Sequence, residues 1–379
     1  MRILSILLCV FFLTGCVSEP EETVPVMAAE TVVETTAVTE PETTESPDPI
    51  REFMDQMSLE ERVGQLFLAR CDDASAVQHV QDYHLGGFVL FGADFQEETP
   101  DSLREKLASY QDAAKIPLLI AVDEEGGTVT RISRYPAFRE SPFPSARDSY
   151  AWGGLVQAVT VEEEKCQLLD SLNINVNLGP VCDISTDANA FMYQRSLGQD
   201  AATTAGYVAG TVQLMNAYGI GSVLKHFPGY GNNVDTHTGI AVDSRSLEEL
   251  EGNDLIPFAA GIDANCGAIM VSHTIVEALD AEFPASLSPA VHTYLREEMG
   301  FEGVILTDDL VMQAITDQYG AGEAAVLAVL AGNDLLCSTD YVTQYEAVLA
   351  AVLDGRIDIH VLNNAVRNVL EWKQSLRLI

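Results

Sequence analysis

Short apolar runs recur along most of the chain, and helix-length segments of mixed polarity separate them. Each run is apolar at consecutive positions rather than at alternate ones, which is typical of strands that are buried on both faces of a parallel sheet. Segments such as residues 102–114 and 247–265 are long enough to form the helices that connect such strands. The runs are residues 63–70, 86–91, 117–123, 174–184, 222–227, 267–273, 303–309 and 333–339.

Eight successive strand-and-helix units predict a single (β/α)8 TIM-like barrel, an α/β fold, over residues 50–379. A doubly wound open sheet is the structural alternative, because a pattern of runs does not show whether the sheet closes. A two-lobed solute receptor is disfavoured, because eight consecutive units do not suggest two lobes.

The start of the chain has the pattern of an export signal. Arg2 precedes an apolar run at residues 3–13 that is too short to cross a bilayer. The tetrapeptide LTGC at residues 13–16 resembles a bacterial lipobox, which predicts a lipoprotein signal peptide over residues 1–15 and a lipid on the sulfur of Cys16. An ordinary secretory signal with a chance cysteine is the alternative. We therefore expect an extracytoplasmic protein, anchored to the cell membrane through this lipid.

Residues 16–49 are predicted to be a disordered, acidic linker rich in Thr and Glu. They contain nine acidic residues and no basic one, and no periodicity that could bury a face. The formal net charge of the whole chain is −37. Nucleic acid is excluded as a partner, because binding its phosphates needs clustered Lys and Arg.

The cysteines of the predicted body do not indicate a metal cluster. Their number is odd and no two have C-x-x-C spacing, so a zinc cluster or a dense disulfide framework is not expected. We interpret them as mainly buried small apolar side chains. They are Cys71, Cys166, Cys182, Cys266 and Cys337.

Polar residues stand at the ends of most of the predicted strands. In a (β/α)8 barrel the carboxyl ends of the strands carry the active site, so we expect these side chains to converge there. They are Arg70, Asp123, Asp183, Lys225 with His226, His273, and Asp308 with Asp309.

Two stretches, the end of the strand before Asp308 and the segment at residues 235–237, carry candidate chemistry for cleaving a glycosidic bond. Asp308 follows a fully apolar strand, and a carboxylate in that position suits a nucleophile. Asp309 must point elsewhere, since successive strand residues alternate faces, so one of the two is predicted to be structural. In the segment Asp235-Thr236-His237, the Asp can accept the Nδ1 proton of the His and leave Nε2 for general acid/base work.

Several motifs together resemble glycoside hydrolase family 3, in its N-terminal-domain form, and within it the NagZ-type β-N-acetylglucosaminidases. The similarity extends over roughly residues 50–375. The motifs are DEEGG at 123–127, QRS at 194–196, KHFPGYG at 225–231 followed by DTH, PASLS at 284–288 and GFEGVILTDDLVM at 300–312.

The resemblance implies a retaining mechanism without a cofactor or metal. Asp308 would be the nucleophile and the pair of Asp235 and His237 the acid/base. The substrate-binding residues that it implies are Asp123, Arg195, Lys225, His226 and His273. The chain departs from the usual pattern at Tyr230, where His is common, at Thr128, where Arg is frequent, and in a segment before DTH that is one residue shorter.

We therefore expect a monomeric exo-acting β-N-acetylglucosaminidase (β-hexosaminidase) that forms a glycosyl-enzyme on cell-wall or chitin-like oligosaccharides. A β-glucosidase or β-xylosidase of the same family is one alternative, although most of those enzymes place the acid/base on an additional domain. A β-N-acetylglucosaminide phosphorylase is a second, because a neutral His donor also admits an anionic acceptor such as phosphate. A sugar-binding lipoprotein without catalysis is a third.

Overall fold

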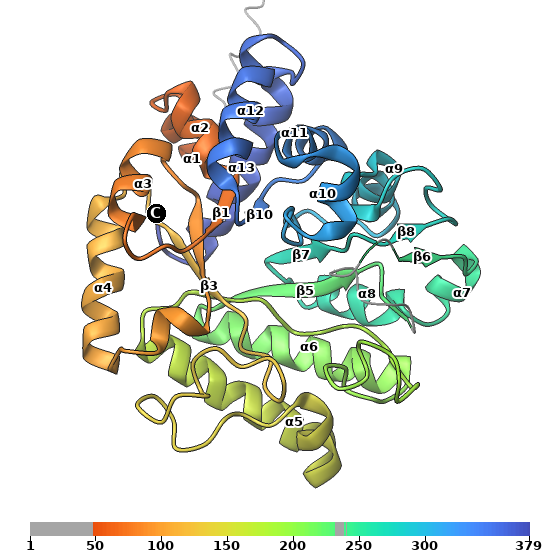
Figure 1. Cartoon of the computed structure of the whole chain (residues 1–379). Coiled ribbons are helices and arrows are strands. Elements are labelled where there is room, and N and C mark those ends of the chain that lie inside the picture. The colour runs from red at the N-terminus through yellow and green to blue at the C-terminus, as the bar shows by residue number, and fades with distance from the viewer. Residues whose placement is uncertain (1–47, 232–238, 240) are drawn as a thin grey trace, which may run out of the picture. The chain divides into compact units, whose positions relative to one another are not determined.

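Eight parallel strands form a barrel at the centre of the protein (Figure 1). The computed structural model describes residues 48–231, 239 and 241–379. The barrel strands are β1 (Phe67–Arg70), β2 (Gly87–Leu90), β3 (Leu119–Val122), β4 (Val176–Asn177), β5 (Gly221–Phe227), β7 (Ala268–Val271), β9 (Val304–Thr307) and β10 (Leu336–Ser338).

The sheet closes on itself. Its strand order is β10-β1-β2-β3-β4-β5-β7-β9, with every neighbouring pair parallel. A parallel bridge between Leu306 and Leu335 joins β9 to the start of β10. The predicted barrel is therefore confirmed and the open doubly wound sheet is wrong. Each of the eight predicted runs overlaps one strand of the barrel.

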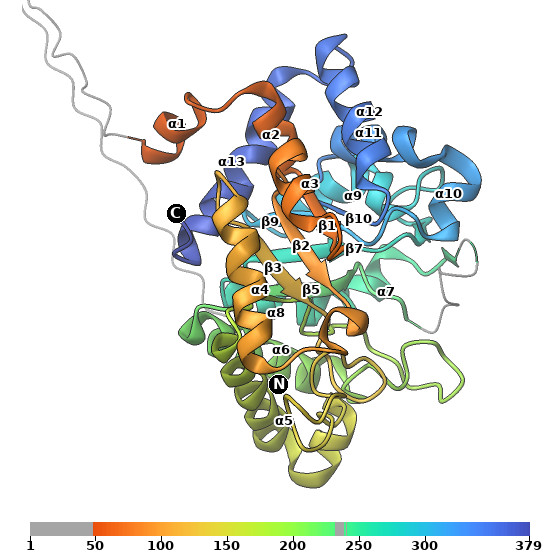
Figure 2. The ribbon, with the colours of Figure 1, turned by 60° about the vertical axis from the view of Figure 1, so that its left-hand side comes forward.

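Helices surround the barrel and make up most of its connections (Figures 1 and 2). They are α1 (Pro49–Met54), α2 (Leu59–Gln65), α3 (Ala76–Tyr83), α4 (Pro100–Ala113), α5 (Ala146–Ser171), α6 (Ala201–Tyr218), α7 (Leu247–Glu251), α8 (Leu255–Asp263), α9 (Pro289–Thr293), α10 (Gln313–Tyr319), α11 (Ala321–Ala331), α12 (Tyr341–Leu353) and α13 (Ile359–Ser375). Two short strands, β6 (Val242–Asp243) and β8 (Ile275–Val276), form a separate parallel pair. Among the described helices, none combines the length and the apolar character needed to cross a bilayer.

Side-chain caps explain where some helices begin. Ser58 and Glu61 form a reciprocal capping box at the start of α2, with Ser58 Oγ accepting from the backbone N–H of Glu61 at 3.2 Å. Helix α4 begins with Pro100 after the capping residue Thr99. Because α2 extends to Gln65, the first three residues of the predicted run 63–70 are helical and only its second half is a strand.

The barrel interior is filled by apolar side chains, and helix α13 closes its amino-terminal end. Val369 and Trp372 of α13 belong to the same buried cluster as the inward-facing residues of the strands. Trp372 fits tightly against the starts of two strands. A Cβ at Gly267 would lie 2.1 Å from Nε1 of its indole, and one at Gly221 would lie 2.8 Å from the ring. Helix α13 therefore covers the amino-terminal end of the barrel interior.

The described chain begins beside the same helix. Asp48 forms an ion pair of 2.8 Å with Arg367 of α13. Figure 2 shows α1 beside α13, on the side away from the loops that follow the carboxyl ends of the strands. The five cysteines of the body are all buried and none of them forms a disulfide, which agrees with their interpretation as core residues.

Candidate active site

A cavity of about 770 Å³ opens at the carboxyl ends of the barrel strands. Asp123 follows β3, Lys225 and His226 belong to β5, Arg195 lies in the loop between β4 and α6, and Asp308 follows β9. All five side chains line the cavity. The structure thus brings together five of the residues that the sequence predicts for the site.

The remaining predicted site residues are placed differently. Asp235 and His237 lie outside the described residues. His273 is fully buried and is not among the described residues that line the cavity. Its ring nitrogens lie 2.7 Å from Oγ of Ser286 and 3.0 Å from the backbone oxygen of Asp309. A direct contact between His273 and a sugar, as predicted, finds no support in this placement, because polypeptide surrounds the ring.

A compact cluster of charges forms one wall of the cavity. Lys225 Nζ lies 2.5 Å from Oδ1 of Asp123 and 2.6 Å from Oε1 of Glu125. Arg195 forms a two-pronged contact with Glu125, at 2.9 Å from Nε to Oε2 and 2.6 Å from Nη2 to Oε1. Arg131 adds a contact of 3.2 Å to Oδ2 of Asp123. Two carboxylates and three cations therefore hold one another in place.

These contacts keep the cluster ionised despite its burial. Burial opposes the charge on Glu125, but Lys225 and Arg195 outweigh it and hold the pKa of that carboxyl well below its ordinary value. Burial likewise disfavours the charge on Lys225, yet Asp123 and Glu125 raise its pKa above the ordinary value. Lys225 is therefore an ammonium donor at neutral pH and does not act as a base.

Sequence reasoning missed Glu125 as a site residue. It stands beside Glu124 in the motif DEEGG, and nothing in the letters distinguishes the two. In the structure, Glu124 instead accepts hydrogen bonds from the backbone N–H groups of Arg131 and Ile132 and so fixes the turn. The buried Lys165 of α5 donates to the backbone oxygen of Glu125 at 2.6 Å. The motif thus contains one residue that shapes the loop and another that holds the site cations.

His226 is oriented by a buried carboxylate. Its Nδ1 lies 2.8 Å from Oδ2 of Asp183, whose other oxygen accepts from the backbone N–H of Tyr230 at 2.7 Å. Nε2 of His226 lies 3.3 Å from Nη2 of Arg195. Since a guanidinium can only donate, this arrangement suits a neutral His226 that carries its proton on Nδ1. His226 therefore has no proton on Nε2 to give to a leaving group.

Asp308 and Asp309 have different surroundings. Asp308 lines the cavity, and its Oδ1 accepts from the backbone N–H of Asp309 at 2.8 Å. The carboxylate of Asp309 instead accepts from the hydroxyl of Thr339 at 2.6 Å and from the backbone N–H groups of Thr339 and Val311. Of the two carboxylates, that of Asp309 thus fixes the local backbone, whereas that of Asp308 faces the cavity.

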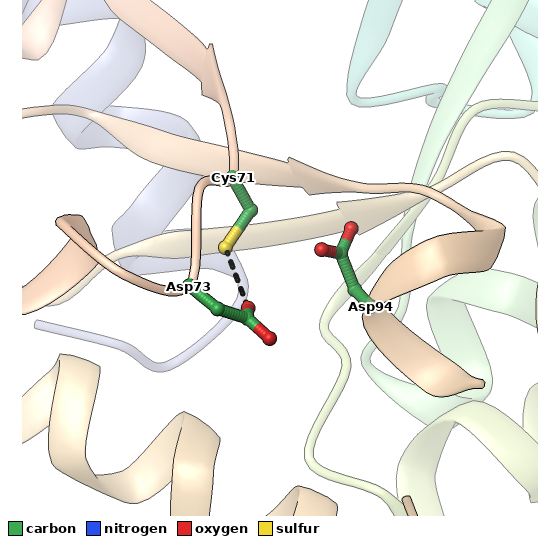
Figure 3. A group of neighbouring side chains, drawn as sticks. All are labelled: Cys71, Asp73 and Asp94. Carbon is green, nitrogen blue, oxygen red and sulfur yellow. Dashed lines mark hydrogen bonds between the residues drawn. The ribbon is translucent and has the colours of Figure 1, made fainter. Parts of the chain in front are cut away.

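A second group of polar side chains lies near the ends of β1 and β2 (Figure 3). Potential ligand atoms of Cys71, Asp73 and Asp94 lie within 4.8 Å of one another. Lys106 Nζ already lies 2.9 Å from Oδ2 of Asp73 and 2.8 Å from the backbone oxygen of Asp94. Burial and the two carboxylates raise the pKa of the Cys71 thiol, so it stays protonated. The ammonium group of Lys106 supplies the positive charge in this cluster, so we interpret the group as a hydrogen-bonded ion pair.

The model of the glycosyl hydrolase family 3 N terminal domain matches residues 58–372. This match spans the whole barrel and every cavity-lining residue described above. The chain belongs to glycosyl hydrolase family 3. Among the curated relatives, a β-hexosaminidase of Xylella fastidiosa is 34% identical over 312 residues, which cover 79% of this chain and 89% of the relative. The β-hexosaminidase LpqI of Mycobacterium tuberculosis is 33% identical over 308 residues, which cover 79% of this chain and 76% of the relative.

Solved structures of family 3 enzymes have the same architecture. A β-N-acetylglucosaminidase of this family from Paenibacillus sp. superposes with a TM-score of 0.79 and 32% sequence identity. The match covers 85% of this chain and 63% of that enzyme. The Mycobacterium tuberculosis LpqI structure superposes with a TM-score of 0.77 and 29% identity, covering 86% of this chain and 96% of LpqI.

Two departures from the family motifs lie in the cavity wall. Thr128 and Tyr230 both line it. Tyr230 is buried and packs edge-on against the ring of His226, with 5.3 Å between the ring centroids. Near Thr128, Arg131 supplies a guanidinium that pairs with Asp123. Both positions line the cavity, and neither side chain takes part in the ion pairs described above for the charge cluster.

Proposed function

We propose that this protein is a retaining, exo-acting β-N-acetylglucosaminidase. The observation that carries the proposal is the position of Asp308, whose carboxylate lines the cavity together with the Asp123, Lys225 and Arg195 cluster. The curated relatives named β-hexosaminidase support the choice of an N-acetyl sugar.

The reaction proceeds in two displacements. In the first, a carboxylate oxygen of Asp308 bonds to the anomeric carbon while the bond from that carbon to the aglycone oxygen breaks. The departing oxygen takes a proton from His237, which Asp235 orients, as the family motif implies. In the second, water attacks the same carbon, gives its proton back to His237 and releases Asp308. Inversion at each step leaves the β configuration of the product unchanged.

The charge cluster binds the terminal sugar. Asp123 and Glu125 offer hydrogen-bond acceptors, and Lys225 and Arg195 offer donors. A sugar hydroxyl can therefore find a partner whether it donates or accepts. The cluster is already ordered by its own ion pairs, so little ordering is needed when the sugar binds. A cavity of about 770 Å³ has the size of a site for one small ligand, which suits cleavage from the end of a chain.

The first experiment compares nitrophenol release from the β-N-acetylglucosaminide and the β-glucoside, with and without phosphate. We expect faster release from the N-acetyl sugar and free N-acetylglucosamine as the product. Faster release from the glucoside would make the protein a β-glucosidase. A rate that requires phosphate and yields the sugar 1-phosphate would make it a phosphorylase. Turnover of neither substrate, with sugar binding retained, would leave a binding protein.

The role of Asp308 is tested by replacing this aspartate with asparagine. Asp308→Asn should lower kcat by at least about 10³-fold, because an amide is a poor nucleophile, while binding of N-acetylglucosamine stays within a few-fold. Asp354→Asn is the matched control, since Asp354 is exposed in the turn after α12 and caps only the backbone of Arg356. Near-normal turnover by Asp308→Asn would refute the assignment.

We also propose that the protein is a lipoprotein, anchored through Cys16 outside the cytoplasm. The support is the sequence at residues 1–16, which lies outside the described residues. Labelling cells with a radioactive fatty acid should mark the parent protein, and Cys16→Ser should remove the label and release the protein from the membrane fraction. Equal membrane retention of the unlabelled variant would contradict the anchor.

A further inference from the structure

We propose that His273 is a positioning residue for the nucleophile. By donating a hydrogen bond to the backbone oxygen of Asp309, it fixes the backbone next to Asp308. The inference rests on the proposed function of Asp308. The contact that carries it is the 3.0 Å distance between Nε2 of His273 and the backbone oxygen of Asp309.

The hydrogen bonds define which nitrogen of His273 carries the proton. A carbonyl oxygen only accepts, so Nε2 must be the N–H donor toward Asp309. The hydroxyl of Ser286 lies 2.7 Å from Nδ1 and can donate to it, which stabilises this same tautomer. Ser286 is itself fixed, because its backbone N–H donates to Ser272 at 3.0 Å and its backbone oxygen accepts from Asn333 Nδ2 at 2.8 Å.

The peptide group that follows Asp309 is held on both sides. Its carbonyl faces His273, and its N–H, which belongs to Leu310, donates to the backbone oxygen of Cys337 at 3.2 Å. The preceding N–H, that of Asp309, donates to Oδ1 of Asp308 at 2.8 Å. A rotation of this backbone would therefore move the donor that orients the Asp308 carboxylate.

His273 occupies the position where such a support is needed. It follows β7, the neighbour of β9 in the barrel, and its side chain is fully buried behind the cavity wall. The carboxylate of Asp309 is held from the β10 side by Thr339. The residue after the nucleophile is thus fixed from both adjacent strands, by His273 on one side and Thr339 on the other. Small displacements of a reacting group can lower rates by about 10²-fold, so this support contributes to turnover.

The test compares three variants with the parent, measuring kcat, KM and the initial burst of nitrophenol from the N-acetylglucosaminide. His273→Gln can place an amide N–H near the position of Nε2, whereas His273→Asn reaches only the position of Nδ1. We expect His273→Ala and His273→Asn to lower kcat by about 10²-fold with KM within threefold. His273→Gln should recover activity to within about tenfold of the parent.

Each outcome decides between roles. A rise in KM, and in the inhibition constant of N-acetylglucosamine, that is equal in all three variants would make His273 a sugar contact and overturn the proposal. Equal kcat in the Gln and Asn variants, or activity that falls only in proportion to the folded fraction seen by circular dichroism, would also overturn it. A parent without turnover would refute the proposed function itself, which is a different result from an active parent with no rescue by Gln.

Discussion

Lys373 is a buried cation whose removal should stabilise the protein. Its side chain is fully buried at the amino-terminal end of the barrel, and its Nζ donates a hydrogen bond of 2.6 Å to Oε1 of Gln65. Burial lowers the pKa of Lys373 from 10.5 to about 7, because the charged form loses its hydration. We therefore expect Lys373→Met to increase the free energy of unfolding at neutral pH.

The magnitude follows from the pKa. One pKa unit corresponds to about 1.4 kcal/mol, so the lowering from 10.5 to about 7 costs the folded state on the order of 4–5 kcal/mol at pH 7. Methionine leaves Oε1 of Gln65 without this donor, which costs about 1–3 kcal/mol. The difference is a net stabilisation of about 1–4 kcal/mol at pH 7.

The effect has a defined pH dependence. Between pH 7 and pH 10.5 the unfolded state binds the lysine proton and the folded state does not, so this residue makes stability rise with pH across that window. Below pH 7 the cost is complete and constant. Toward pH 10 the advantage of Lys373→Met should therefore disappear, and only the lost hydrogen bond should remain.

Denaturation by guanidinium chloride between about pH 6 and pH 10, followed by tryptophan fluorescence, measures this difference. The chain has two tryptophans, the exposed Trp152 and the buried Trp372, so the signal reports mainly on the region beside Lys373. Comparing the variant with the parent cancels the other titrating groups. A variant that is less stable than the parent by the same amount at pH 7 and pH 10 would refute the reasoning.

Two further predictions concern the site and the end of the barrel. Glu125→Gln should lower the free energy of unfolding by about 3–5 kcal/mol at neutral pH, because it leaves Lys225 and Arg195 short of a buried partner. Because the folded pKa of Glu125 is lowered, its contribution is present above the ordinary value near 4.5 and is lost as the pH falls, so parent and variant should converge in acid. Gly267→Ala should cost about 1–3 kcal/mol and change the fluorescence of Trp372, since its Cβ would meet the indole. Gly219→Ala is the control, because its Cβ would meet no other atom within 4 Å. Its φ of +70° should still cost about 1–2 kcal/mol, but the fluorescence should not change. Equal fluorescence spectra in the two variants would contradict the contact between residue 267 and Trp372.

The eight strands could be predicted because strands buried on both faces leave continuous apolar runs. The boundaries of these strands could not be predicted equally well from the apolar runs. Residues 63–65 are buried in helix α2, and an apolar run gives the same signal in a buried helix as in a buried strand. The run 174–184 contains a strand of only two residues, because the chain leaves the sheet after Asn177. Segment 247–265 divides into α7 and α8, which a count of residues does not reveal.

The site was predictable where a residue acts from the end of a strand. Asp123, Lys225, His226 and Asp308 meet because parallel strands bring their carboxyl ends to one edge. The place of Glu125 in the site, and the contact that His273 makes, depend instead on how segments far apart in the chain meet. Glu125 meets Arg195 across 70 residues, and His273 meets Asp309 across 36. Such pairings are set by the way the loops fold back, which local patterns do not encode.

The closure of the barrel also constrains how the chain is made. Strand β1, which is synthesised early, pairs with β10, which is synthesised near the end, and α13 follows later still. Pairings this distant in sequence form slowly, because a long loop must close before they contribute. A chain that stopped before α13 would carry every predicted catalytic residue, yet its barrel would lack Val369 and Trp372, which cover its amino-terminal end. We therefore expect the barrel to reach its stable folded state only after the last helix has been synthesised.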